Sequence, residues 1–402
     1  MAVPKLRFPE FTDDWEQRKL GDLYTERNER GNGSLQILSV SIHTGVSDGE
    51  LDVDNLGKFV RRSEDKSTYK HVHSGDLIFN MMRAWQGAIG VAKTEGMISP
   101  AYISAIPSED IYPPFMNYLL RRKDVINQIN NLSYGVTDFR KRLYWNSFVQ
   151  VNCKLPSVEE QRNITDVFEK IDHLITLHQR KLDDIKLLKK SMLQKMFPAE
   201  GRDVPEVRFP GFTAAWEQRK LSEVVTEIKR TDEKSDAPVM MITAENGFIN
   251  QSERYSTNNA GQSLKKYILL EKGELAYNHG ASKLRPYGSC FALTTEEKAR
   301  IPFVYHCFST ETENSEFLSI VLNGKAVEKQ LRRIVSSGAR MDGLLNISFD
   351  EYTSIPVMLP RKDEQDRIAE YFKNLDHHIT LHQRKCDDLQ KLKKALLQQM
   401  FC

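Results

Sequence analysis

Two long segments of the chain carry apolar residues at helical spacing. Between Glu159 and Met196 there is no glycine and no proline, and apolar residues recur at steps of three and four positions. The same pattern returns near the end of the chain, in residues 361–401. This spacing places the apolar side chains along one narrow seam of an α-helix. The predicted seam residues are Phe168, Ile171, Ile175, His178, Leu182 and Ile185 in the first helix and Phe372, Leu375, Ile379, His382 and Leu389 in the second.

Each of these helices is too long to be covered by one small domain, since such a helix spans roughly 57 Å at about 1.5 Å per residue. Its seam needs a partner, and the matching seam in the chain is the other helix. We therefore predict a two-helix coiled coil, antiparallel because the second helix must return to where the first began. His178 and His382 fall on the seam. A packed polar residue that fixes the register is favoured over a metal site or proton switch there.

The helices belong to a repeat that runs through the whole chain. Residues 4–20 and 205–221 agree at 12 of 17 positions, and residues 155–197 and 359–401 agree at 24 of 43. The middles, roughly 22–154 and 223–358, diverge. One fold used twice, with a shared frame and two different surfaces, explains this pattern. The alternative is an old duplication whose middles drifted without function.

Each variable middle mixes short strand-like runs with helical stretches. We predict strands at 76–81, 101–106, 275–278 and 301–308 and helices at 115–131 and 315–335. The fold class is therefore α+β: two similar mixed α/β domains separated by two long helices, with a pseudo-twofold internal repeat. The predicted boundaries are 1–154 for the first domain, 155–200 for the first helix region, 201–358 for the second domain and 359–402 for the second helix region.

Composition narrows the class of protein. The 57 basic and 55 acidic residues leave a net charge of +2, so any nucleic-acid footprint would have to be local. The five cysteines show neither a zinc-binding nor a disulfide spacing. There is no apolar signal core at the start and no run of membrane-spanning length, so we expect a soluble cytoplasmic protein that does not contact a membrane.

Polar and aromatic residues gather in the irregular stretches of the variable middles. Arginine and lysine can bond guanine, and asparagine and glutamine can pair with adenine, in the major groove of DNA. A phosphate contact or a plain surface charge is the alternative for each one. The candidate DNA-binding residues are Asn80, Arg83, Trp85, Gln86, Arg140, Lys141, Arg142, Asn278, Lys283, Arg285, Arg340 and Asp342.

The sequence offers no catalytic motif. It has no glycine-rich cofactor loop and no GxxxxGK[ST] phosphate loop. Tyr112-Pro-Pro-Phe115 is similar to the Asn/Asp-Pro-Pro-Tyr/Phe motif of amino-methyltransferases. A tyrosine at its first position cannot orient a target amino group as a carbonyl does, so a proline turn before a helix is favoured. We expect no catalytic residues, no metal site and no cofactor in this chain.

The repeated motifs carry a resemblance. Arg7-Phe8-Pro9 with Trp15-Glu16 occurs again in the second half, as does the Leu-Pro-x-x-x-Glu-Gln motif at residues 155–161 that heads the long helix. With Gly75-Asp76-Leu77 and the stretch 82–90, these motifs resemble type I restriction-modification specificity subunits over essentially the whole chain.

That resemblance implies a function and partners. Such a subunit reads a bipartite site in double-stranded DNA through two target recognition domains, with the helices setting the spacing between the half-sites. It binds two methyltransferase subunits, which use S-adenosylmethionine to methylate adenine. Restriction/translocase subunits that use ATP and Mg²⁺ complete the enzyme. Two alternatives remain: a stand-alone methyltransferase or restriction enzyme, which would need a cofactor pocket, and a coiled-coil scaffold or adaptor without sequence-specific DNA binding.

Overall fold

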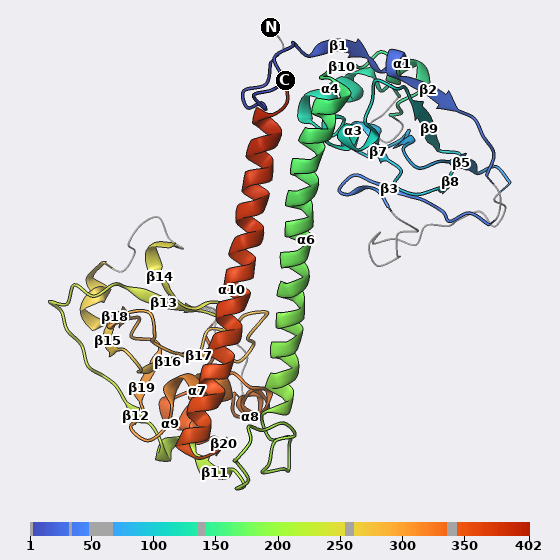
Figure 1. Cartoon of the computed structure of the whole chain (residues 1–402). Helices are drawn as coiled ribbons and strands as arrows, with labels where there is room; N and C mark the ends of the chain where they lie inside the picture. The colour runs from blue at the N-terminus through green and yellow to red at the C-terminus, as the bar shows by residue number, and fades with distance from the viewer. Residues whose placement is uncertain (1–2, 32–33, 48–66, 136–140, 254–260, 336–343) are drawn as a thin grey trace. The chain divides into compact units, whose positions relative to one another are not determined.

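The computed structural model describes residues 3–31, 34–47, 67–135, 141–253, 261–335 and 344–402 (Figure 1). The chain forms two compact units, and each contains one end of each long helix. Unit 1 comprises Met1–Gln179 and Gln383–Cys402, and unit 2 comprises Arg180–His382. Each unit mixes strands and helices, so the predicted α+β class is confirmed. The predicted domain boundaries at 154 and 358 fall within two strands, β10 (Asn152–Leu155) and β20 (Pro356–Leu359).

Unit 1 is built on a four-stranded antiparallel sheet with the strand order β2-β9-β6-β7. Strand β6 (Leu77–Asn80) is buried along its whole length and lies at the centre. In chain order, unit 1 contains β1 (Glu16–Lys19), α1 (Leu20–Leu23), β2 (Tyr24–Arg27), β3 (Val40–Ser41), β4 (Gly45–Val46), β5 (Lys70–Val72), β6, the 3-10 turn η1 (Ala84–Gln86), β7 (Ile89–Val91), β8 (Gly96–Ile98), β9 (Tyr102–Pro107), α3 (Pro113–Leu119), α4 (Lys123–Leu132), α5 (Trp145–Phe148), β10 (Asn152–Leu155) and the start of α6 (Val158–Lys195).

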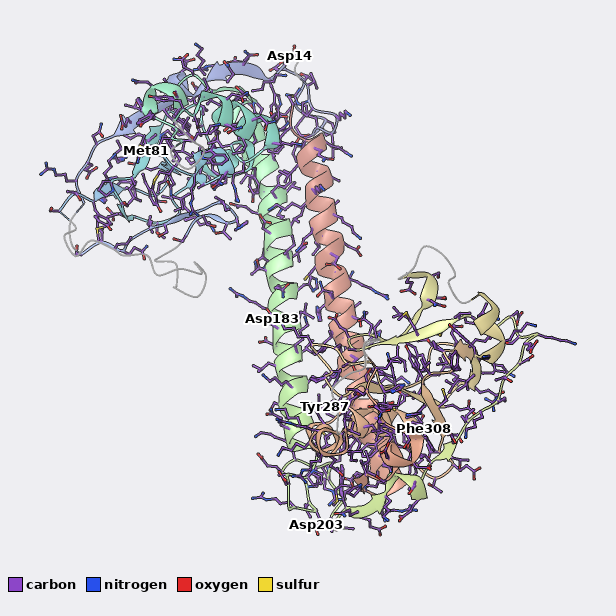
Figure 2. All side chains as sticks on the ribbon, turned by 180° about the vertical axis from the view of Figure 1, so that it is seen from behind. Asp14, Met81, Asp183, Asp203, Tyr287 and Phe308 are labelled. Atoms are coloured by element: carbon purple, nitrogen blue, oxygen red, sulfur yellow. The ribbon has the colours of Figure 1, made fainter. Side chains whose placement is uncertain are left out.

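Unit 2 repeats this plan with a sheet of order β12-β19-β16-β17. Phe308, labelled in Figure 2, lies in β19 and pairs with Leu275 of the central strand. In chain order, unit 2 contains the end of α6, β11 (Glu217–Lys220), η3 (Leu221–Glu223), β12 (Thr226–Glu227), β13 (Met240–Thr243), β14 (Gly247–Asn250), η4 (Gln251–Glu253), η5 (Gly261–Lys266), β15 (Ile268–Glu271), β16 (Leu275–Asn278), β17 (Ser289–Ala292), β18 (Lys298–Ile301), β19 (His306–Ser309), α7 (Ser315–Leu322), α8 (Lys325–Ile334), α9 (Phe349–Thr353), β20 (Pro356–Leu359) and the start of α10 (Lys362–Gln399).

Three predicted elements are broken in two. The helix expected at 115–131 is α3 and α4, separated at Arg122, whose backbone is extended (ψ 149°). The helix expected at 315–335 is α7 and α8, separated by the extended Gly324. The strand expected at 301–308 is β18 and β19. A turn divides them in which Tyr305 donates its N–H to the carbonyl of Pro302 (3.0 Å), and proline cannot continue a strand ladder because it has no N–H.

Helices α6 and α10 each contain 38 residues. Within unit 1, the start of α6 and the end of α10 lie side by side in opposite directions (Figure 1). Phe168 packs near Phe401, Lys393 forms an ion pair with Asp172, and the carbonyl of Ile175 faces the Cys386 thiol. Within unit 2, the same antiparallel pairing joins Phe197 to Phe372 and Lys189 to Asp376.

The repeated sequence motifs of unit 1 meet at the start of α6. Arg7 donates from Nε and Nη2 to the two carboxylate oxygens of Glu160, at 2.8 Å each. The Trp15 indole N–H also donates to Glu160 (3.3 Å). Gln161 accepts the backbone N–H of Tyr112 and donates to the carbonyl of Pro156. These motifs therefore hold the N-terminal segment and the start of the long helix against the rest of unit 1.

A second repeated motif forms the turn before the central strand. Gly75 and its counterpart Gly273 have φ values of 94° and 88°, a backbone conformation that favours glycine. Asp76 follows the first glycine and accepts the backbone N–H of His73 (2.8 Å). Glu274 does the same for Glu271 in unit 2 (2.6 Å).

Candidate nucleic-acid interface

In unit 1, the two candidate loops predicted from sequence are joined to each other. The backbone N–H of Leu143 donates to the carbonyl of Met81 at 2.8 Å, directly beyond the end of β6. Lys141 places its ammonium 5.6 Å from the ring centroid of Trp85. The Trp85 indole N–H donates to the carbonyl of Met82 (3.0 Å). Stretches more than fifty residues apart in sequence therefore form one surface of unit 1.

The side chains on this surface differ in how freely they can reach a ligand. Arg83, Gln86 and Arg142 are exposed. Trp85 and Lys141 are half-buried, and the Lys141 ammonium donates to the side-chain oxygen of Asn130 (2.6 Å). The exposed groups offer the planar donors and the amide that read guanine and adenine edges. Lys141 supplies a fixed positive charge beside an aromatic ring.

Two tyrosines beside these loops were not among the predicted site residues. Tyr134 and Tyr144 stack with their ring centroids 4.9 Å apart and 28° between the ring planes. They remain 60% and 37% exposed, although large aromatic rings usually bury more of their area. Tyr134 also forms an isolated antiparallel bridge with Arg142. In the sequence the two tyrosines stand in irregular stretches with nine residues between them, and nothing in that spacing indicates that they stack.

In unit 2, the corresponding loops are joined by the same hydrogen bond. Leu345 donates its backbone N–H to the carbonyl of His279 at 2.9 Å, directly beyond the end of β16. An antiparallel bridge between Gly280 and Leu344 extends this contact. Lys283 and Leu284 are exposed in the loop that follows. The frame that presents the candidate loops is therefore shared by the two units, while the side chains on it differ.

Two of the predicted base-reading residues form turns in the structure. Asn80 and Asn278 are the last residues of β6 and β16. Asn80 is buried, and its side-chain oxygen accepts the N–H of Met82 (2.9 Å). The Asn278 oxygen accepts from Gly280 (2.9 Å), and its amide donates to the carbonyl of Ile242 (3.0 Å). Asparagine commonly closes a turn in this way, with an acceptor two residues before the donor.

Arg285 is also hydrogen-bonded within its own unit. Its Nη1 donates to the carbonyl of Asn323 at the end of α7 (2.7 Å), so the guanidinium caps a helix of its own unit. Burial lowers the pKa of this guanidinium, while Glu328 opposes the shift. The side chain is half-buried, which leaves Lys283 as the exposed cation of this loop. The predicted residues Arg140, Arg340 and Asp342 lie outside the described residues.

The predicted seam residues are all at least half-buried. Phe168, Ile171, Leu182, Phe372 and Leu375 are buried. The other six, Ile175, His178, Ile185, Ile379, His382 and Leu389, are half-buried.

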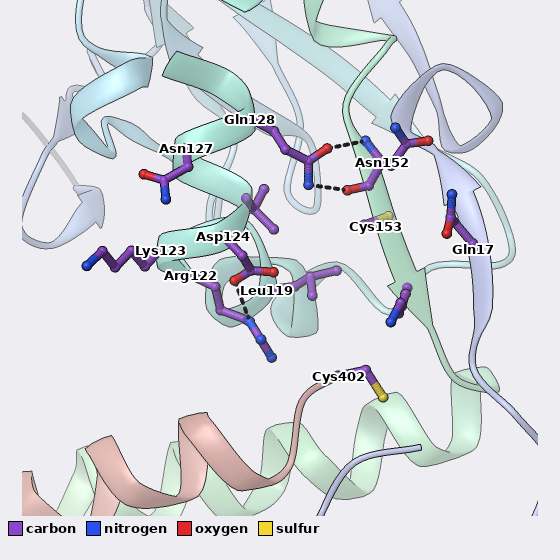
Figure 3. A pocket seen from close by; sticks show the side chains of 12 residues that line it. Gln17, Leu119, Arg122, Lys123, Asp124, Asn127, Gln128, Asn152, Cys153 and Cys402 are labelled. Atoms are coloured by element: carbon purple, nitrogen blue, oxygen red, sulfur yellow. Dashed lines mark hydrogen bonds and ion pairs between the residues drawn. The ribbon is translucent and has the colours of Figure 1, made fainter. Parts of the chain in front are cut away.

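A pocket of about 650 Å³ lies in unit 1, between α4, β10 and the C-terminal residues (Figure 3). Gln128 spans part of its wall by exchanging two hydrogen bonds with the backbone of Asn152, at 3.0 and 3.1 Å. Arg122 forms an ion pair with Asp124 there. None of the candidate DNA-binding residues lines the pocket. The pocket therefore adds nothing to the candidate interface.

Comparison with known proteins shows what this arrangement is similar to. Residues 214–391 match the family model of the type I restriction modification DNA specificity domain. The chain is 22% identical to a putative type I restriction enzyme MjaX specificity subunit of Methanocaldococcus jannaschii, over 98% of this chain and 94% of that protein. It is also 22% identical to the MjaVIII specificity subunit of the same organism, over 98% of this chain and 92% of that protein.

A solved structure shares the fold. The type I restriction-modification S subunit of M. genitalium superposes with a TM-score of 0.57 at 12% identity, covering 100% of this chain and 99% of that one. The family match lies in the second half of the chain, and the internal repeat carries its frame into the first half. The family model thus matches within the second half of the chain, and along its full length the chain is similar to type I restriction-modification specificity subunits.

Proposed function

We propose that this chain is the non-catalytic DNA-recognition subunit of a type I restriction-modification complex, and that each unit reads one half of a bipartite site in double-stranded DNA. One observation carries the proposal. The hydrogen bonds Leu143–Met81 and Leu345–His279 join two loops at the same place in each unit, while the side chains on those loops differ. Two readers of unlike half-sites require a constant frame and variable contacts of this kind.

The chemistry of the unit 1 loops fits a DNA ligand. Arg83 and Arg142 are exposed cations, and Gln86 is an exposed amide beside them. The stacked Tyr134–Tyr144 pair adds an accessible aromatic face. Cations position a protein on the phosphate backbone, and arginine and glutamine reach base edges with paired hydrogen bonds. The interface thus combines a positioning element with reading elements.

The long helices are the proposed docking surface for the partner subunits. They carry exposed leucines outside the seam, Leu187 at 67% exposure among them. Exposed apolar side chains that recur along a helix mark a surface for another protein. The exposed leucines of the two helices are Leu174, Leu177, Leu187, Leu188, Leu193, Leu381 and Leu392.

The proposed partner subunits follow from the similarity of this chain to type I restriction-modification specificity subunits. Two methyltransferase subunits would bring S-adenosylmethionine and methylate an adenine in each half-site, and restriction/translocase subunits would bring ATP and Mg²⁺. The helices would set the number of base pairs between the half-sites. Among the residues with described structure, no helix is both long and apolar enough to cross a lipid bilayer. A complex that acts on cellular DNA would work in the cytoplasm.

Methylation mapping tests this proposal directly. The chain would be co-expressed with its cognate methyltransferase subunit, and modified adenines would be mapped genome-wide by single-molecule sequencing. We expect two short motifs separated by a fixed gap. A stable complex that methylates nothing would favour a protein scaffold instead, and a motif with one half only would remove the two-reader proposal. S-adenosylmethionine binding by the isolated chain would contradict the assignment of the chemistry to a partner.

A further inference from the structure

Four titratable side chains of unit 1 lie together on one face of a small sheet. His71 is in β5, which pairs with β8, and its other neighbour is the segment at 29–31. The bridge Arg30–Lys70 places Glu29 directly opposite His71, and the pair Val72–Gly96 places Glu95 opposite His73. Residues two apart in a strand share a face. The register alone therefore brings two histidines and two glutamates together.

The side chains make a specific pattern within this group. The Glu29 oxygens lie 2.8 Å from His71 Nδ1 and 3.0 Å from His73 Nε2. The other nitrogens of the two rings face Glu95 Oε1, at 2.8 Å for His71 and 3.8 Å for His73. Donor atoms of Glu29, His71 and His73 all lie within 4.8 Å of one another. Glu29 is thus on one side of both rings, and Glu95 is on the other.

This is the donor arrangement of a metal site with an outer carboxylate. Zinc takes nitrogen and oxygen ligands at about 2.0–2.2 Å, which places tetrahedral donors about 3.4 Å apart. Histidines that bind a metal usually donate their second N–H to a carboxylate, which fixes the ring orientation. Glu29, His71 and His73 fit the ligands, and Glu95 fits the outer carboxylate. Two histidines and one carboxylate leave a fourth position open for water or another ligand.

A neighbouring arginine leaves one Glu29 oxygen available. Arg27 is held by Asp76 through two hydrogen bonds, at 2.6 and 3.1 Å. Its Nη1 also donates to Glu29 Oε2 (3.1 Å). Oε2 therefore lies between Arg27 and His73 Nε2, while Oε1, which Arg27 does not contact, faces His71 Nδ1. A bound cation would use Oε1.

Unit 2 has the same backbone and lacks this chemistry. There Leu269 donates its N–H to the carbonyl of Arg230, as His71 does to that of Glu29. Glu271 stands at the position of His73, and Lys298, which is opposite Glu271 in the neighbouring strand, stands at the position of Glu95. These positions form ordinary ion pairs: Lys298 lies 3.1 Å from Glu271, and Arg230 lies 2.7 Å from Glu274. The histidine cluster is therefore a feature of unit 1 and not of the shared frame.

We propose that Glu29, His71 and His73 bind one Zn²⁺ ion in unit 1, with Glu95 as the carboxylate that positions both imidazoles. Zinc accepts both imidazole nitrogen and carboxylate oxygen as ligands. The ion would cross-link the segment at 29–31 to β5 and stabilise the small sheet of the first recognition unit. The second unit stabilises the same place with ion pairs.

The proposal can be tested on the full-length chain without a histidine tag. The protein would be stripped with a chelator, dialysed and titrated with Zn²⁺ by calorimetry, and with Co²⁺ to follow its visible d–d bands. We expect about one equivalent of metal and a rise in the unfolding temperature on adding Zn²⁺, because a ligand of the native state stabilises it. A failure to bind one equivalent tightly enough to compete with a weak chelator would overturn the proposal.

Variants distinguish this site from adventitious binding. His71→Leu, which copies Leu269 of unit 2, should abolish the binding and the d–d bands. Glu95→Gln should keep one equivalent but weaken affinity by about 10–100-fold, as expected for an outer carboxylate. The control is His377→Gln with His378→Gln, a pair of exposed neighbouring histidines on α10, which should change nothing. If the control loses binding, or if His71→Leu retains it, the site is not the one proposed. Should His71→Leu fail to fold, the exposed Glu95→Gln variant decides.

Discussion

Arg208 and Glu364 form a bidentate ion pair at the start of α10. Arg208 Nε lies 2.6 Å from one carboxylate oxygen of Glu364, and Nη2 lies 2.7 Å from the other. Glu364 is 1% exposed. The pair is the counterpart of Arg7–Glu160 in unit 1. In both units the Arg-Phe-Pro motif therefore meets the Glu-Gln motif at the start of a long helix. Hydrogen bonding to Glu364 raises the pKa of Arg208, which keeps the guanidinium charged.

Replacing Glu364 should therefore destabilise unit 2 strongly. Glu364→Gln keeps the shape of the side chain but leaves the Arg208 charge largely buried without its partner. Breaking a buried ion pair from one side typically costs about 3–5 kcal/mol. Urea unfolding would measure the loss. Glu370→Gln, at an exposed position of the same helix, is the control. A loss below about 1 kcal/mol would mean that the pair behaves like an exposed one.

The frame of the fold was predictable because its sequence signals are local and repeated. The long helices follow from a spacing of three and four residues over 38 positions, and their pairing follows because each seam lacks another partner. The break between α3 and α4 was not predictable, because neither glycine nor proline marks Arg122. The backbone turns there because the two short helices pack separately, which is tertiary information.

The candidate site was predictable only as a set of loops. Arg83 and Gln86 are exposed as a reading surface requires, whereas Asn80, Asn278 and Arg285 are bound to their own backbone. Residue type shows what a side chain can bond but not whether the chain already uses that bond. The pairing of Tyr134 with Tyr144, and the histidine cluster around β5, depend on strand register between distant segments. Sequence spacing does not reveal such contacts.

Substituting Arg83 should affect one half-site and leave the other unchanged. Arg83 is exposed on the unit 1 loop, and a paired arginine–guanine contact is worth about 1–3 kcal/mol of discrimination. Methylation rates of Arg83→Ala would be measured in the reconstituted methyltransferase on a series of sites substituted at each position. The matched variant Lys283→Ala should affect only the other half-site. Arg361→Ala, an exposed position at the start of α10, is the control. Equal losses across both halves would indicate a phosphate or folding effect instead.

Lengthening both long helices together should lengthen the spacer of the DNA site. Heptad insertions of about seven residues after Gln179 and after His382 preserve the seam and add about 10.5 Å, or about three base pairs at 3.4 Å each. The pairs Asp172–Lys393 and Lys189–Asp376 remain within their own units and should persist. Genome-wide methylation mapping would report the new spacer, with both half-sites unchanged. An insertion in α6 alone is the control, since it shifts the seam register and should destabilise the fold. An unchanged spacer in the doubly extended chain would show that the helices do not set it.

Unit 2 should lose stability on mild acidification through His306. Burial lowers the pKa of His306 from its ordinary value of 6.5, and the neighbouring His279 adds to the shift. His306 Nε2 lies 3.0 Å from the carbonyl of Ile347, so the neutral ring carries its proton on that nitrogen. Because the folded protein prefers the neutral form, its stabilisation is present above about pH 6.5 and is lost as the pH falls toward the lower folded value.

The measurement is thermal unfolding at a series of pH values from about 8 to about 5.5, where histidines titrate, with a chelator present so that metal binding in unit 1 plays no part. His306→Gln keeps a donor to Ile347 but cannot titrate. We expect the wild-type unfolding temperature to fall more steeply below about pH 6.5 than that of the variant. His378→Gln, at an exposed position of α10, should follow the wild-type curve. Parallel curves for wild type and His306→Gln would show that the buried ring does not control the acid response of this unit, and that another group titrates there.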